Sequence, residues 1–215
     1  MNELEFIKHY VANASQLMWF LGAGTSRSAG MPTATDIIWD LKLKYYCLKQ
    51  NQDIKNHDIS NDVIKQRTQT YMDSLNYAAL WSPEEYSFYF ELTFGNDYDA
   101  QRKYLVEKLN SKNISLNIGH RVLGALIELQ KAKVIFSTNF DEVIETAYSK
   151  ISGKNLSTYH LEGSYAALEA LNTENFPIYA KVHGDFKYRS VKNLSSDLLN
   201  NDQKIQDCFL AACVR

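Results

Sequence analysis

Cysteines and long apolar runs are scarce in this chain of 215 residues. Its three cysteines, an odd number without a Cys-x-x-Cys pair, argue against a disulfide framework and against a zinc site. The apolar runs are far shorter than the roughly 20 residues of a membrane helix, and the N-terminal segment lacks the apolar core of a signal peptide. We therefore expect a cytoplasmic protein that contacts no membrane and holds no metal.

The chain also lacks an excess of charge of either sign. Its 23 Lys and Arg residues nearly balance 25 Asp and Glu residues, which leaves a net charge of −2 and no electrostatic footprint for nucleic acid. Apolar residues make up 45% and charged residues 22%, which excludes wholesale disorder. At roughly 150 residues per domain, the length predicts one large domain, or one with a sizeable insertion.

Only nine glycines are present, and three of them lie between Gly22 and Gly30. The apolar run Leu17–Leu21 comes directly before them, which predicts a buried parallel strand that ends in a glycine turn. Gly22 and Gly24 would let the backbone approach a ligand such as a phosphate, although a turn that serves packing alone stays an alternative. Arg27 stands where a dehydrogenase fingerprint has its third glycine, so the turn does not indicate hydride transfer.

Strands and helices alternate through most of the chain. This alternation predicts an α/β fold with a parallel sheet covered by helices on both faces. We expect strands at residues 17–21, 134–138, 157–160 and 178–182, and helices at residues 1–12, 117–131, 142–150 and 166–171.

One block interrupts this alternation. Residues 40–113 contain almost no glycine, are rich in tyrosine and repeat apolar residues every three or four positions, which predicts a helical insertion. Ser82 and Pro83 predict a helix start, with the serine as the cap. We expect most aromatic rings of the insertion to pack within it, and the rest to cover the functional site or form an assembly surface.

Small or polar residues follow three of the predicted strands. They are the glycine turn, Asn139 and Asp141 after residues 134–138, and His183 after residues 178–182. Ligands of open parallel sheets bind beyond the carboxyl ends of the strands, so these residues predict one shared site. Plainer interpretations stay open: Asn139 as a helix cap, Asp141 as a favourable charge at a helix start, and His183 as a structural residue.

In order, spacing and strand context, these segments resemble the sirtuin family. The resemblance covers about residues 15–190 and implies a Rossmann-like domain that binds NAD, with Asn139 and His183 as its catalytic residues. The motifs that carry it are Gly22-Ala23-Gly24-Thr25-Ser26, Gly30-Met31-Pro32, Asn117-Ile118-Gly119-His120, Ser137-Thr138-Asn139-Phe140-Asp141 and His183-Gly184. The NAD contacts that it implies are Gly22, Ala23, Gly24, Ser26, Pro32, Thr138, Asn139, Asp141 and His183.

Two departures from the protein-deacylating sirtuins decide which members the chain resembles. Pro32 is not followed by their Asp-Phe-Arg segment, and no group of four zinc cysteines follows His183. The Thr138–Asp141 segment instead resembles bacterial sirtuin-like domains that destroy NAD in anti-phage defence. The resemblance therefore implies an NAD glycohydrolase with NAD as its substrate. A protein deacylase or ADP-ribosyl transferase is one alternative, and a non-catalytic sensor of an NAD derivative is another.

The last residues predict a helix that reaches Arg215, with Phe209 and Val214 among its apolar positions. Sirtuin-like sheets carry a further strand after such a helix. We therefore expect residues 1–215 to be the N-terminal part of a longer protein, with part of the sheet beyond Arg215. We also expect a homo-oligomer or a partner defence protein, and contact with nucleic acid only through such a partner.

Overall fold

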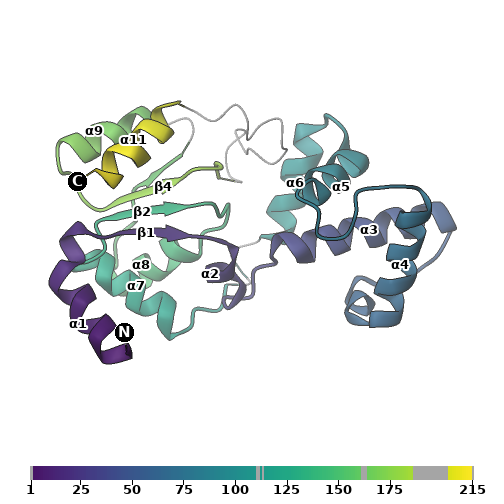
Figure 1. The fold of residues 1–215 in the computed structure, drawn as a ribbon, viewed down its shortest axis with the longest axis horizontal. Coiled ribbons are helices and arrows are strands. Elements are labelled where there is room, and N and C mark those ends of the chain that lie inside the picture. The colour runs from purple at the N-terminus through teal and green to yellow at the C-terminus, as the bar shows by residue number, and fades with distance from the viewer. Residues whose placement is uncertain (1, 110–111, 113, 161–163, 186–202, 215) are drawn as a thin grey trace.

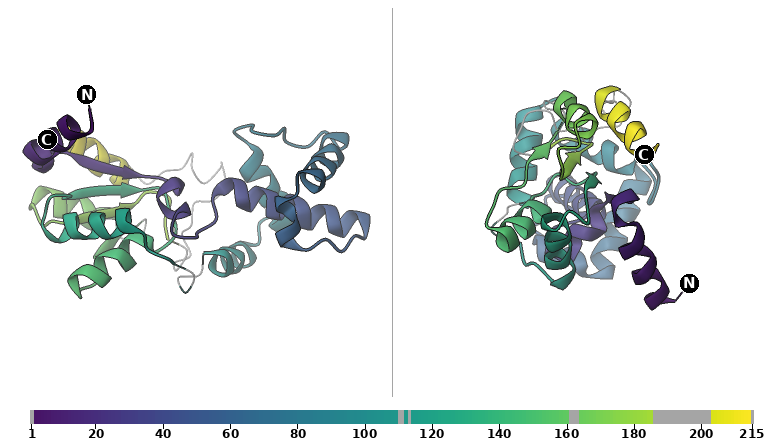
Figure 2. Two further views of the ribbon diagram at one scale, coloured as in Figure 1. Left: turned by 90° about the horizontal axis from the view of Figure 1, so that it is seen from below. Right: turned by 90° about the vertical axis from the view of Figure 1, so that its left-hand side faces the viewer.

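The computed structural model describes residues 2–109, 112, 114–160, 164–185 and 203–214. A sheet with its covering helices forms one lobe, and a group of helices beside it forms the other (Figures 1 and 2). The chain enters the helical lobe after the first strand and returns to the sheet lobe for the second, so the helical lobe is inserted between β1 and β2.

The sheet has four parallel strands in the order β1-β2-β4-β3. Every residue of β2 and β4 is buried, which explains why these strands appear in the sequence as nearly continuous apolar runs. Leu21, Ser137 and Lys181 pair across the sheet, so three strands end at the same level. The strands are β1 (Met18–Leu21), β2 (Val134–Ser137), β3 (Thr158–Tyr159) and β4 (Ile178–Lys181).

Helices cover both faces of this sheet, as the sequence predicts (Figure 1). Ile135 and Tyr179 pack on one face against α7 (Ile118–Glu128) and α8 (Val143–Ser152). Phe136 and Ala180 pack on the other face with α9 (Ser164–Asn172) and α11 (Gln203–Cys213). At the edge of the sheet, α1 (Glu3–Asn13) leads through a 3-10 turn, η1 (Ala14–Gln16), into β1.

The two helices α7 and α8 approach each other so closely that only glycine fits between them. A Cβ atom added to Gly124 would lie 2.9 Å from the carbonyl oxygen of Ala147, closer than real Cβ contacts. The two helices therefore pack directly against each other on the same face of the sheet.

The helical lobe has its own core, built around Leu41, Met72, Tyr89, Phe90 and Leu105. Most aromatic residues of the block pack in this core, whereas Trp81 is exposed. They include Tyr45, Tyr46, Tyr71, Tyr77, Tyr86, Phe88, Tyr89 and Phe90. The expectation that most rings pack within the lobe is therefore confirmed; the boundaries 40–113 stay a prediction. The lobe contains α3 (Ala34–Gln50), the 3-10 turn η2 (Asn56–Ser60), α4 (Asp62–Ser74), α5 (Glu85–Phe94) and α6 (Tyr98–Lys108).

A helix does begin next to Ser82 and Pro83, but the prediction that Ser82 caps it is wrong. The first helical residue of α5 is Glu85, and the hydroxyl of Ser82 has no hydrogen-bond partner among the described residues. The Glu85 carboxylate forms an ion pair with the buried ammonium of Lys42 and accepts a hydrogen bond from the Trp81 amide. These tertiary contacts fix the start of the helix in place of a serine cap.

None of the helices in the described part of the chain is both long enough and apolar enough to cross a bilayer.

Candidate functional site

A cavity of about 280 Å³ lies at the carboxyl ends of β1, β2 and β4. The sheet lobe contributes its polar wall, and the helical lobe contributes Ala34, Ile37, Tyr86 and Leu109. Seven of the nine residues that the sequence predicts as NAD contacts line this cavity: Ala23, Ser26, Pro32, Thr138, Asn139, Asp141 and His183. Gly22 and Gly24 are not among its lining residues, although both belong to the turn that carries Ala23 and Ser26.

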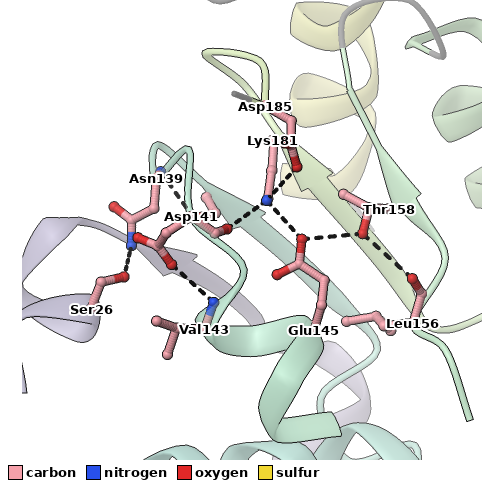
Figure 3. Close-up of polar contacts among 10 residues, drawn as sticks. Ser26, Asn139, Asp141, Val143, Glu145, Leu156, Thr158, Lys181 and Asp185 are labelled. Carbon is pink, nitrogen blue, oxygen red and sulfur yellow. Dashed lines mark hydrogen bonds and ion pairs between the residues drawn. The ribbon is translucent and has the colours of Figure 1, made fainter. Parts of the chain in front are cut away.

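Asn139 is buried at the end of β2 and joins it to the glycine turn after β1. Its side-chain nitrogen donates to the carbonyl oxygen of Gly22 at 3.0 Å. The same nitrogen donates to the hydroxyl of Ser26 at 2.9 Å (Figure 3). A carbonyl only accepts, so these bonds fix which end of the amide is nitrogen. The Oδ1 atom accepts no hydrogen bond from the described residues, and it is the part of the amide that a ligand can use.

Asn139 therefore does not cap the following helix, contrary to one interpretation of the sequence. The N-cap residue of α8 is Glu142, and Asp141 comes directly before it. The Oδ1 atom of Asp141 accepts from the amide of Val143, the first residue of α8, at 3.0 Å (Figure 3). Asp141 also lines the cavity and is almost completely buried. The hydrogen bond from Val143 fixes the carboxylate at the cavity wall, and Oδ2 makes no hydrogen bond to the described residues.

His183 follows β4 by two residues and reaches the cavity from the carboxyl end of that strand, next to the end of β2. The next residue, Gly184, has φ of +91°, a backbone conformation that favours glycine. The sharp turn there lets the chain leave the sheet directly after His183. The imidazole lies against the ring of Phe140, with 6.4 Å between ring centroids.

His120, to which the sequence analysis assigns no role, supports the glycine turn. Its Nδ1 atom accepts from the amide of Asn117 at 3.2 Å, so the proton must be on Nε2. That nitrogen donates to the carbonyl oxygen of Thr25 at 2.6 Å. His120 thereby anchors the short helix α2 (Ala23–Arg27) that carries Ser26 into the cavity.

Sequence reasoning missed the buried charges beneath the site. The ammonium of Lys181 contacts carboxylate oxygens of Asp185 and Glu145 at 2.6 and 2.7 Å. Burial raises the pKa of Glu145, and the attraction of Lys181 offsets this only in part. In the sequence, Lys181 is a single charged residue in an otherwise apolar strand. Its place two residues before His183 is the one sequence signal that it lies near the predicted site.

No group of three or more histidine, cysteine, aspartate or glutamate side chains is arranged to hold a metal ion within the described ranges.

The geometry defines a class of protein: an α/β protein with a cavity at the carboxyl edge of a parallel sheet. The family model described as "SIR2-like domain" matches residues 133–215 of the chain. The matched part contains β2, β4, Asn139 and His183, and it supports a sirtuin-like domain with an NAD-related function. A comparison with curated proteins gives no match.

Proposed function

We propose that the protein is an NAD glycohydrolase that cleaves NAD to nicotinamide and ADP-ribose. The observation that carries the proposal is the meeting of Asn139 and His183 on the walls of one cavity, beside the turn that contains Ser26. The SIR2-like match supports NAD as the substrate, since members of that family are NAD-dependent enzymes.

Cleavage of NAD needs only chemical groups that the side chains of the cavity provide. The bond between C1′ of the ribose and the nicotinamide nitrogen breaks, and its electron pair stays on that nitrogen. Because the leaving group is cationic in NAD, it departs neutral and needs no acid. The site must instead stabilise oxocarbenium-like charge and place a water on the opposite face of the ribose.

Asn139 and His183 have complementary roles in this scheme. The free Oδ1 atom of Asn139 accepts a hydrogen bond from a ribose hydroxyl or from the attacking water. The His183 imidazole accepts the proton that the water loses as its oxygen bonds to C1′, a role that typically contributes about 10²–10⁴-fold. Asp141 holds the nicotinamide carboxamide, and the turn from Gly22 to Ser26, including Gly24, holds the diphosphate. Thr138 and Pro32 complete the wall around NAD.

We further propose that this hydrolysis depletes NAD in bacterial anti-phage defence, in an assembly of several copies or with a partner defence protein. The Thr138–Asp141 segment and the lack of zinc cysteines after His183 support this assignment over protein deacylation. NAD levels in phage-infected cells that carry the gene, compared with cells that carry a His183→Ala variant, test the assignment.

The biochemical test is incubation of the longest natural form of the protein with NAD, with and without an acetylated lysine peptide and with and without a chelator. We expect equal amounts of nicotinamide and ADP-ribose in all four mixtures. Release that requires the peptide would indicate a deacylase, and NAD binding without release would indicate a sensor.

A further inference from the structure

A buried cation lies between the two loops that carry Asn139 and His183. Lys181 is the last residue of β4, and its side chain is fully buried. Its ammonium donates to the carbonyl oxygen of Asp141 at 2.6 Å and to Oδ2 of Asp185 at 2.6 Å, and it pairs with Oε1 of Glu145 at 2.7 Å (Figure 3).

These three partners come from three different parts of the site. Asp141 lies two residues after Asn139, in the loop that follows β2. Asp185 lies two residues after His183, in the loop that follows β4. Glu145 belongs to the first turn of α8. One ammonium therefore joins both loops to each other and to the helix that packs beneath the sheet.

The contacts satisfy the ammonium completely. It has three N–H donors, and the structure provides one oxygen for each of them. Burial alone would lower the pKa of Lys181, but the carboxylates of Glu145 and Asp185 raise it above its ordinary value. Lys181 is therefore charged at neutral pH, and a charge-assisted contact of this kind holds its partners in one geometry.

A second buried lysine provides a comparison within the same molecule. Lys42 pairs with Glu85 and donates a hydrogen bond to the side-chain oxygen of Gln69, but all three residues belong to helices of one lobe. That contact joins helices of the lobe core. The contacts of Lys181, by comparison, include the two loops that form the cavity wall.

We propose that Lys181 is a positioning residue, which sets the placement of Asn139 relative to His183 by binding the loop that carries each of them. The proposal rests on the proposed function, because both residues must meet one ribose. A misplacement of about 1 Å in such a pair is enough to lower turnover by about 10²-fold.

The test uses Lys181→Met, which keeps an unbranched side chain that lacks only the terminal ammonium, and Asp185→Asn, which keeps both the ammonium and the shape of the Asp185 side chain. Asp40→Asn is the matched control, because Asp40 is also a nearly buried carboxylate, 2.7 Å from the ammonium of Lys108, but lies in the helical lobe. Three quantities are measured for each protein: the rate of nicotinamide release, the affinity for a carbocyclic NAD analogue that cannot be hydrolysed, and the NMR signals of the Asn139 side-chain amide, assigned with Asn139→Ala.

We expect both site variants to lower turnover by about 10- to 100-fold while the affinity for the analogue changes by less than about twofold. We also expect Asp185→Asn to shift the Asn139 amide signals, although the two residues lie on different loops. The control should change none of these quantities. Turnover within twofold of the wild type, or Asn139 signals that stay in place, would overturn the proposal.

Two further results keep the proposals distinguishable. If Lys181→Met does not fold, Asp185→Asn alone decides the result, since it leaves the ammonium paired with Glu145. If the wild-type protein releases no nicotinamide, the proposed function fails, and the Asn139 signals still show whether the Lys181 contacts join the two loops.

Discussion

Replacement of Asn139 by alanine should destabilise the fold as well as remove activity. The Asn139 amide makes two hydrogen bonds at 2.9 and 3.0 Å, to Ser26 and Gly22. Alanine leaves both acceptors without this donor, and each lost bond costs about 0.5–1.5 kcal/mol. We therefore expect the free energy of unfolding to fall by about 1–3 kcal/mol, which lowers Tm by roughly 2–12 °C in a chain of this size.

Thermal unfolding followed by circular dichroism measures this loss, and Ser26→Ala is the matched comparison. Ser26→Ala removes only one of the two hydrogen bonds, so its Tm should lie between those of the wild type and Asn139→Ala. Nicotinamide release is measured on the same samples at a temperature where all three proteins are folded. A Tm of Asn139→Ala equal to that of the wild type would refute the hydrogen-bond geometry from which the loss is calculated.

Three further predictions concern other parts of the molecule. Gly24→Ala should leave Tm unchanged or slightly raised, because the added Cβ would have no described atom within 4 Å apart from its chain neighbours and the backbone of its own helix. If the glycine turn holds the diphosphate as proposed, the methyl group should also weaken NAD-analogue binding by about tenfold in calorimetry. Asp40→Asn should lower the free energy of unfolding by about 1–2 kcal/mol at pH 7, measured by urea unfolding. Burial raises the pKa of the Asp40 carboxyl, but its contacts, above all Lys108, outweigh burial and lower that pKa below 3.8. The difference in stability from the wild type should therefore persist above pH 3.8 and vanish as the pH falls through the native pKa. A thiol reagent followed by mass spectrometry should modify exposed Cys213 first and Cys208 last, because burial raises the pKa of Cys208 to about 11; early modification of Cys208 would contradict its place in the core.

The sequence predicts the sheet well because burial on both faces leaves a direct pattern. Residues 134–138 and 178–182 are apolar runs for the same reason that β2 and β4 are covered by helices on both sides. The side chains after these runs could be placed at one site because parallel strands end at the same edge. Asn139 and His183 do line one cavity, which follows from topology alone.

The parts that the sequence does not predict depend on contacts between distant residues. Lys181 and Glu145 are 36 positions apart, one in a strand and the other in a helix. No local sequence pattern therefore predicts their ion pair. The first amide of α8 donates to Asp141, whereas the Asn139 amide is bonded to the glycine turn. The helix start at Glu85 likewise depends on Lys42, an interaction between two helices of the lobe.

The most direct test of the central claim compares the wild type with His183→Ala in two measurements: nicotinamide release from NAD, and calorimetric binding of the carbocyclic NAD analogue. If His183 accepts the proton of the attacking water, the variant should lose about 10²–10⁴-fold in turnover while its affinity for the analogue stays near that of the wild type. Turnover that survives the replacement would contradict the claim that this cavity hydrolyses NAD through His183.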